Sequence, residues 1–344
     1  VETSEAGLYG LGCATFNQRP LPVAVAVDKY LAPFAQGRDV DNIEDMWQNA
    51  YTSSYWRNGP VLNNALSGLD QALWDIKGKV YGVPVYKLLG GPTRDRVRVY
   101  GKVDKKTGVN AMKVLPRGLK RSPYKYAEGK KMVSEVAERF RALREEYGDG
   151  VDIGIDFHGA VQPGTALLLV KALEPYHPWF YEEVVPCLNV DVMADIAKQT
   201  HIPLATGERI FTKWGFREIL EKHAATILQP DLCHAGGITE TRIIAGMAEA
   251  YYAAIAPHNP LGPISLAAGV QLAASIPNFL CQEQRSLGEG YLTAPSEVED
   301  GYIAIPTGPG LGIDVDRDKL NALLYDGAWR TPELRHPDGS VADW

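Results

Sequence analysis

The chain has 344 residues, of which 45% are apolar and 22% charged, and its formal net charge is −7. Such a composition is typical of a globular protein, and the length exceeds what one hydrophobic core usually supports, so we expect two domains. The negative charge argues against nucleic acid or an anionic membrane as the main partner. A small anionic substrate is still compatible with it, because a bound metal or a local group of Arg and Lys can reverse the field inside one cleft.

Four cysteines, Cys13, Cys187, Cys233 and Cys281, lie far apart and form no C-x-x-C motif. We therefore expect reduced thiols and a cytoplasmic protein. No run of apolar residues reaches the roughly 18 that a membrane span requires, and no signal-peptide pattern is present. Because Val1 is not a start residue, we expect the chain to begin inside a longer gene product.

Residues 1–92 predict a small α+β domain. A strand end is expected at 8–12, and helical patterns cover 22–34 and 40–51. Between 69 and 80 apolar residues recur every three or four positions, which predicts a helix over 59–81 with one buried face. Gly82 and Pro84 are expected to end this helix.

From residue 97 onward, short apolar strands alternate with helical segments. We predict strands at 97–103, 111–115, 152–158, 179–185, 203–209, 226–231, 254–259 and 278–284. From 152 on, each pair encloses enough residues for a helix, so the fold class is α/β with a parallel sheet, and eight strands indicate a (β/α) barrel over 93–290. The segment 291–344 contains a predicted strand at 302–305 and is expected to pack back on the cap and the barrel.

One connection is too short for this pattern. Only about seven residues, 104–110, separate the first two strands, whereas a parallel crossover needs about a dozen or more. We therefore predict that residues are missing there, either absent from the structure or deleted from the chain. A gap in the backbone between 103 and 110 would confirm the first alternative, and ordinary connectivity with an antiparallel hairpin would contradict both.

Six successive predicted strands end in ionisable residues, and three of these are evenly spaced. Asp156, Glu182 and Glu208 are each 26 residues apart. One βα unit per step would bring their carboxylates together at the mouth of a barrel, where active sites lie. Three oxygen ligands that would otherwise repel one another favour one Mg²⁺ ion. The alternative is that each acid caps a helix or stays solvated.

Two histidines also fall at strand ends. His158 lies two residues after Asp156, so both share a face, and it is placed to act as a general acid or as a supporting hydrogen-bond partner. His258 and Asp231 end neighbouring strands and predict a base whose imidazole is oriented by a carboxylate, or else a buried structural pair. No Ser or Cys stands in a nucleophile-elbow motif, which leaves metal-assisted acid–base chemistry next to a carboxylate.

Together these segments resemble the enolase superfamily, mandelate racemase subgroup, and most closely its galactonate dehydratases. The matching segments are Leu69–Lys79, Asp156–Gly159, Glu182–Glu183, Gly207–Arg209, Gln229–Asp231, His234–Glu240, Ala256–His258 and Gln282–Gln284. Their spacings fit over nearly the whole chain, apart from the region around 104–110.

The resemblance implies a (β/α)7β TIM-type barrel with an N-terminal α+β capping domain, and Mg²⁺ held by Asp156, Glu182 and Glu208. His258 with Asp231 would remove the α-proton of an aldonate such as galactonate, gluconate or mannonate, and His158 would protonate the departing 3-hydroxyl. A Lys or His base beside one or two Mg²⁺ ions is the general pattern of enolase-superfamily sites. The substrate contacts that we expect are Glu283, Lys113, Arg209, Asn17, Arg57 and Trp56, the last three from cap loops at 15–19 and 54–57. A homo-oligomer is expected as well.

Some features depart from the resemblance. Val184 follows the paired glutamates where many relatives have Pro, and Leu115 stands where racemases carry the second Lys of a Lys-x-Lys pair. The missing base favours dehydration over epimerisation, because racemisation needs a second proton carrier on the opposite face. The loop 116–126 is more similar to mannonate dehydratases. A racemase or epimerase of a 2-hydroxy acid, and a catalytically silent binding protein, remain alternatives.

Overall fold

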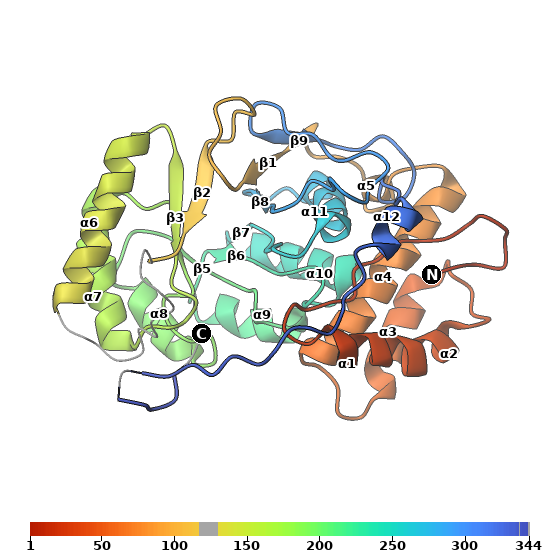
Figure 1. Cartoon of the computed structure of the whole chain (residues 1–344), viewed down its shortest axis with the longest axis horizontal. Coiled ribbons are helices and arrows are strands. Elements are labelled where there is room, and N and C mark those ends of the chain that lie inside the picture. Colours follow the sequence, from red (N-terminus) through yellow and green to blue (C-terminus); the bar gives the residue numbers. More distant parts are fainter. Residues whose placement is uncertain (117–129, 337, 343–344) are drawn as a thin grey trace.

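A computed structural model describes all residues except 117–129, 337 and 343–344, so most of the loop 116–126 lies outside the described residues. Figure 1 shows a group of N-terminal helices on one side of a curled sheet, whose outer face is covered by further helices. The C-terminal segment runs from the sheet across the N-terminal helices. This is the arrangement of a barrel with a cap.

The cap is mainly helical. Its elements are α1 (Pro20–Ala26), the π-helix η1 (Val27–Leu31), α2 (Ala32–Ala35), α3 (Ile43–Ser53), α4 (Pro60–Tyr81) and α5 (Val85–Leu88). Helix α4 confirms the helix predicted over 59–81: Pro60 suits its first turn, and Gly82, at φ +66°, ends it in the left-handed conformation. The one strand pairing that joins two residues of the cap to each other is the bridge between Glu2 and Tyr9.

Nine short strands follow in the described part of the chain, and each lies inside or beside a predicted one. They are β1 (Arg96–Tyr100), β2 (Ala111–Val114), β3 (Asp152–Asp156), β4 (Tyr181–Glu182), β5 (Leu204–Thr206), β6 (Ile227–Leu228), β7 (Ala254–Ile255), β8 (Gln282–Glu283) and β9 (Tyr302–Ala304). Strands β2 to β7 form one parallel sheet in sequence order, and β8 pairs with β1 in parallel. A parallel bridge from Ile255 to Phe279 links β7 to the segment before β8.

The remaining elements lie between or after the strands. They are α6 (Lys130–Tyr147), α7 (Pro163–Leu173), the 3-10 helix η2 (Glu174–Tyr176), α8 (Val190–Ala197), α9 (Thr212–Glu221), α10 (Gly237–Ala250), α11 (Pro263–Ser275) and α12 (Arg317–Asn321). The largest apolar cluster lies where these helices pack on the sheet. A second cluster fills the interior of the curled sheet. Its buried residues lie on the strands or directly next to them, and they are Tyr100, Ala111, Phe180, Ala205, Ile227, Ala256 and Cys281. The TIM-type fold class is confirmed.

The connection between β1 and β2 differs from the prediction. The backbone is continuous through residues 103–110 and turns back with an antiparallel bridge between Asp104 and Val109. The predicted backbone gap is therefore absent, whereas a deletion from the chain stays a prediction, because a chain that lacks residues would also have a continuous backbone here. The turn does not extend into a ladder, because β1 has β8 on one edge and the antiparallel strand β9 on the other. The C-terminal segment thus covers the edge of β1 that β2 would occupy in a closed barrel.

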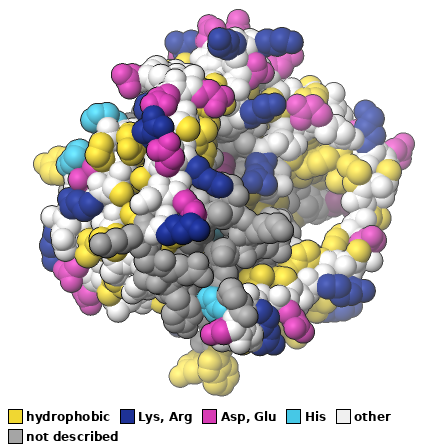
Figure 2. All heavy atoms as spheres, turned by 60° about the vertical axis from the view of Figure 1, so that its left-hand side comes forward, with side chains coloured by type: hydrophobic (Ala, Val, Ile, Leu, Met, Phe, Trp, Pro, Cys, Tyr) yellow, Lys and Arg dark blue, Asp and Glu magenta, His cyan; other side chains and the backbone are white. Residues whose placement is uncertain are grey.

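No helix in the described part of the chain combines the length and the apolar character that crossing a membrane demands. On the face shown in Figure 2, acidic and basic side chains alternate without forming a broad patch of one sign. The described residues on this face thus offer no extended basic surface for a polyanion.

Candidate active site

The carboxyl ends of the strands meet at one cavity of about 1230 Å³. Asp156 and Glu182 are the last residues of β3 and β4 and are paired directly in register. Glu208 lies two residues beyond the end of β5. The residues lining the cavity include Lys113, Asp156, His158, Glu208, Arg209, His234, His258 and Glu283. Of the three predicted metal ligands, Asp156 and Glu208 thus line this cavity, whereas Glu182 does not.

Lys113, on β2, lies among three of these carboxylates. Its Nζ is 2.7 Å from Glu182 Oε1, 3.4 Å from an Asp156 oxygen and 3.5 Å from Glu283 Oε1. Burial alone lowers the pKa of Lys113, but the surrounding carboxylates raise it well above its usual value overall. The ammonium therefore stays charged and neutralises part of the buried negative charge. A lysine held in this state is not available as a neutral base.

Asp156 is fully buried and keeps one oxygen for a further ligand. Oδ1 accepts a hydrogen bond from the backbone N–H of His158 at 2.8 Å. Oδ2 accepts no aligned hydrogen bond within the described residues, although His158 Nε2 is 2.9 Å away. Burial raises the pKa of Asp156, but Lys113 and His158 outweigh it and lower the pKa to about 2. This carboxylate is therefore ionised.

His158 is held in an uncommon backbone conformation, with φ +50°. Its contact with Asp156 raises the pKa of the imidazole, against the opposing effect of burial. A histidine held protonated at the edge of a cavity suits proton donation.

The second glutamate of the pair has a different role from the first. Glu182 accepts a hydrogen bond from Gln229 Nε2 at 2.5 Å, and burial next to Asp156 raises its pKa well above normal. Glu183 points away to Arg209, whose Nε and Nη2 donate to its two oxygens at 2.9 and 2.7 Å. Consecutive residues of a strand point to opposite faces, which agrees with this arrangement. Arg209 lines the cavity, but its guanidinium is engaged by Glu183.

His258 and Asp231 form the predicted pair. His258 Nδ1 is 2.8 Å from Asp231 Oδ2, while the other Asp231 oxygen accepts the backbone N–H of Cys233 at 2.7 Å. Because Nδ1 is occupied, Nε2 is the ring atom left for other groups, and it lies 3.2 Å from Glu208 Oε2. Burial lowers the pKa of His258, but Glu208, Asp231 and Glu283 raise it to about 10 overall. Asp231 thus orients the imidazole, which is protonated near neutral pH while the charge of Glu208 is uncompensated; a cation on Glu208 would lower this pKa and free Nε2 to take a proton.

The cap fixes the loop that carries Asp231. Gln71 of α4 donates to the carbonyl of Leu232 at 3.1 Å, and Trp47 of α3 donates to that of Gly236 at 2.7 Å. Asp70 accepts hydrogen bonds from Thr239 N and Oγ1. A Cβ on Gly237, at φ +81°, would collide with the Asp70 carboxylate. The loop is therefore specified by close packing against polar residues of α4.

The cap residues predicted to contact substrate do not all reach the cavity. Asn17 lines it. Trp56 is 84% exposed, and the Arg57 guanidinium lies over the Tyr51 ring at 5.4 Å; neither is among the lining residues. His234 does line the cavity, and its Nδ1 is 3.0 Å from the carbonyl oxygen of Glu208.

Sequence reasoning assigned no role to several residues at the site. Gln229 holds Glu182, and its position two residues before Asp231 could have indicated that both side chains lie on one face. Trp329, Thr331 and Pro332 of the C-terminal segment also line the cavity. No periodic pattern points to these three.

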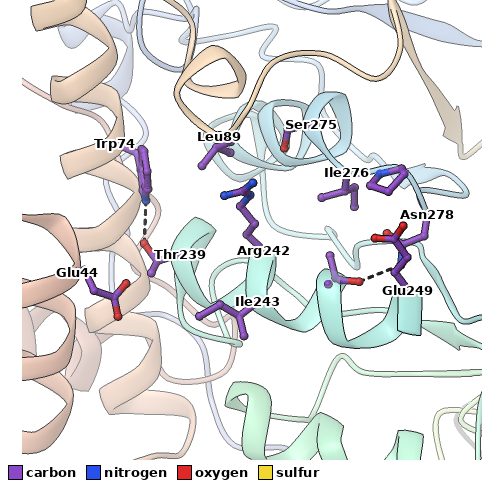
Figure 3. A pocket seen from close by; sticks show the side chains of 13 residues that line it. Glu44, Trp74, Leu89, Thr239, Arg242, Ile243, Glu249, Ser275, Ile276 and Asn278 are labelled. Atoms are coloured by element: carbon purple, nitrogen blue, oxygen red, sulfur yellow. Dashed lines mark hydrogen bonds between the residues drawn. The ribbon is translucent and has the colours of Figure 1, made fainter. Parts of the chain in front are cut away.

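A smaller cavity of about 380 Å³ lies between the cap and α10. Figure 3 shows its lining, with Arg242 and Ile243 from α10, Trp74 from α4 and Ser275 from the end of α11. Its two acids, Glu44 and Glu249, come from opposite sides of the opening. Its described lining lacks the paired His and carboxylate groups that could move a proton, so the larger cavity is the candidate active site.

The family follows from matches to both parts of the chain. Residues 1–90 match the N-terminal domain of mandelate racemase / muconate lactonizing enzyme, and residues 101–319 match the enolase C-terminal domain-like family. The chain belongs to this family. The expected superfamily is thus confirmed, and the cavity lies at the carboxyl ends of the strands, where barrels of this type carry their active sites.

Relatives within the family are named dehydratases. The chain is 44% identical to the D-galactonate dehydratase of Ralstonia nicotianae, over all of this chain and 95% of the relative, and 40% identical to that of Cronobacter sakazakii with the same coverage. An enolase from Pantoea ananatis, solved with bound D-gluconate and Mg, is 34% identical with a TM-score of 0.90, covering 99% of this chain and 94% of that one. The Ralstonia alignment spans 370 positions, so that relative has residues that this chain lacks.

The residues of this site fit a hard divalent cation. Ligand atoms of Asp156, His158 and Glu208 lie within 4.8 Å of one another, and the Asp156 oxygen without an aligned hydrogen bond is buried. Glu182 is not part of this group, and its two oxygens accept hydrogen bonds from Lys113 and Gln229. A second group, Asp231, His234 and His258, also lies within 4.8 Å. The first group has two carboxylates and one imidazole and the second has one carboxylate and two imidazoles, so the first is closer to the oxygen ligands that Mg²⁺ prefers.

Proposed function

We propose that this protein is a Mg²⁺-dependent dehydratase of an aldonic acid, and that it forms a 2-keto-3-deoxy acid. The observation that carries the proposal is the presence of two histidines in one cavity, each paired to its own carboxylate: His158 to Asp156 and His258 to Asp231. His158 is suited to give a proton, and His258 would take one when a cation on Glu208 lowers its pKa. The dehydratase names of relatives at 40–44% identity support the same chemistry.

Proton removal falls to His258. Its Nε2 faces the cavity because Asp231 holds Nδ1, and this hydrogen bond stabilises the imidazolium that forms when the base takes the α-proton of the substrate. Glu208 would share the metal with Asp156 and Glu182. When bound, Mg²⁺ supplies the positive charge that stabilises an ene-diolate. Lys113 adds a fixed positive charge next to the same place.

Loss of the hydroxyl falls to His158. Proton transfer from its imidazolium to the 3-hydroxyl lets that group leave as water while the C2–C3 double bond forms. The resulting enol then becomes the 2-keto acid by tautomerisation. Base and acid are separate residues, so the two half-reactions can be separated by mutation.

An epimerase needs a second base on the face opposite His258. In this chain the lining residue two positions after Lys113 is Leu115, which has no titratable group. The geometry therefore favours dehydration over epimerisation.

The test is a screen of hexonic and pentonic acids with Mg²⁺-loaded protein, with semicarbazide detection of keto acid and NMR of the products. We expect a 2-keto-3-deoxy acid from galactonate, gluconate or mannonate. An epimer without keto acid would replace the proposal by an isomerase. Binding of acid sugars without any product would indicate a silent member of the family.

A further inference from the structure

The C-terminal segment reaches the mouth of the active-site cavity. In Figure 1 it continues beyond α12 and runs along the lower side of the molecule, past α1 and toward the sheet. Trp329, Thr331 and Pro332 of this segment line the same cavity as Asp156 and His258. Residues far apart in the chain therefore enclose one volume.

The segment is fastened to the cap at this place. Arg19 Nη2 donates to Thr331 Oγ1 at 3.2 Å, and the Arg19 guanidinium lies 4.8 Å from the centroid of the Trp329 ring. Arg19 makes no ion pair with an acid in the described part of the chain, so its charge is balanced only by the π-face and by neutral oxygens. Trp329 is half-buried, and its ring nitrogen donates no hydrogen bond to another described residue.

The proposed chemistry fixes the direction of a bound substrate. Its C1 carboxylate and C2 must lie at the strand ends, near Lys113 and His258. The polyhydroxy chain must then extend toward the remaining wall of the cavity, which the cap loop around Asn17 and the C-terminal segment provide. An indole face suits the C–H groups of a sugar chain, and Thr331 and Arg19 offer hydrogen bonds to hydroxyls.

We propose that Trp329 and Thr331, held by Arg19, form a distal subsite that binds the C5–C6 end of a six-carbon aldonic acid. This inference rests on the proposed function and adds a substrate-length preference to it. The subsite is built from a segment outside both the cap and the barrel, so it can set selectivity without altering the proton-transfer residues.

Steady-state kinetics and binding test the subsite separately from catalysis. The variants are Trp329→Ala, Trp329→Phe and Thr331→Val, with Leu324→Ala as a control, because Leu324 belongs to the same segment, is 71% exposed and does not line the cavity. The substrates are the best hexonate and the pentonate with the same configuration at C2–C4. Trp329→Ala should lower kcat/KM for the hexonate about tenfold or more, mainly through KM, and change that for the pentonate less than about threefold. Trp329→Phe should lose less.

Calorimetric binding of the same hexonate to the Mg²⁺-loaded His258→Asn protein, with and without Trp329→Ala, gives a readout that needs no turnover. Weaker hexonate binding with unchanged pentonate binding supports the subsite. Three outcomes would overturn the subsite: equal losses of affinity for both acids, no loss for either, or a loss that Leu324→Ala reproduces. Tighter binding of a six-carbon diacid than of the hexonate, if it depends on Arg19, would overturn it as well. If wild-type protein makes no keto acid but its hexonate binding still depends on Trp329, the proposed reaction fails and the subsite stands.

Discussion

His158 and His258 differ in their surroundings, and this difference assigns them opposite roles. His158 is partly exposed and touches Asp156, whereas His258 is buried and held through Nδ1 by Asp231. Both residues could be found from sequence, because side chains two apart in a strand share a face and parallel strands end at one edge. Gln229 obeys the same rule, but an amide carries no charge that would mark it as part of a site. Trp329 and Arg19 lie in irregular segments, where no periodicity predicts which residues meet.

Separate roles for the two histidines predict separable defects. His258→Asn should abolish both exchange of the α-proton with D₂O and keto-acid formation, lowering kcat by about 10²–10⁴. His158→Gln should lower keto-acid formation by a similar factor while α-proton exchange continues. Deuterium incorporation followed by NMR, together with semicarbazide assays, measures both. Equal loss of exchange in the two variants would contradict the assignment.

The raised pKa of Glu182 predicts that metal binding depends on pH. Burial favours the protonated carboxyl, and a bound cation requires the ionised one, so protons compete with Mg²⁺. Mg²⁺ affinity measured by calorimetry should therefore rise with pH, with protons released on binding. In Glu182→Gln the affinity should be lower and this proton release smaller. A pH-independent affinity in the wild-type protein would show that Glu182 is not a ligand.

Among the elements, strand positions were predictable but strand lengths were not. The run 203–209 predicts a strand of seven residues, whereas β5 spans only Leu204–Thr206. The strand is shorter because the backbone leaves the sheet and enters a loop at the mouth of the barrel. The strand at 302–305 was expected, but its partner was not. It pairs with β1, which lies about 200 residues earlier in the chain, and the pattern of apolar residues within one segment does not show which distant segment it pairs with.

The short turn between β1 and β2 contains one position, residue 108, where we expect only Gly to fit. Gly108 has φ +73°, and a Cβ there would lie 2.5 Å from Asp300 Cα, next to β9. Gly37 has a similar φ of +75°, but a Cβ at that position would have nothing within 4 Å. Gly108→Ala should thus lower the free energy of unfolding by at least about 1 kcal/mol more than Gly37→Ala does. Denaturant unfolding measures both, and equal losses would contradict the packing of this turn on the C-terminal segment.

On the scale of the molecule, the cap and the barrel are joined by buried polar contacts rather than by apolar packing alone. Asp70 of α4 is fully buried against Thr239, and burial raises its pKa to about 7, with the hydrogen bonds from Thr239 opposing this effect. The folded state therefore binds this proton more tightly than the unfolded chain does. The homo-oligomer expected from the sequence stays a prediction.

Asp70 predicts a pH-dependent loss of stability. Because its folded pKa lies above the unfolded value, its contribution is most favourable below about pH 4 and is lost as the pH rises to about 7. The unfolding free energy of the wild-type protein should fall relative to that of Asp70→Asn from about pH 4 to about pH 8, by at most about 4 kcal/mol. Urea unfolding of both proteins at several pH values measures the difference. A constant difference across this range would contradict the raised pKa.

The proposed reaction requires Asp156, Glu182 and Glu208 to hold one divalent cation between His158 and His258. Crystals grown with Mn²⁺ in place of Mg²⁺, and measured for anomalous scattering, show directly whether they do. We expect one anomalous peak within bonding distance of oxygens from all three carboxylates, with Lys113 displaced from Glu182. A peak on Asp231, His234 and His258 instead, or no peak at saturating Mn²⁺, would contradict this site and the function proposed from it.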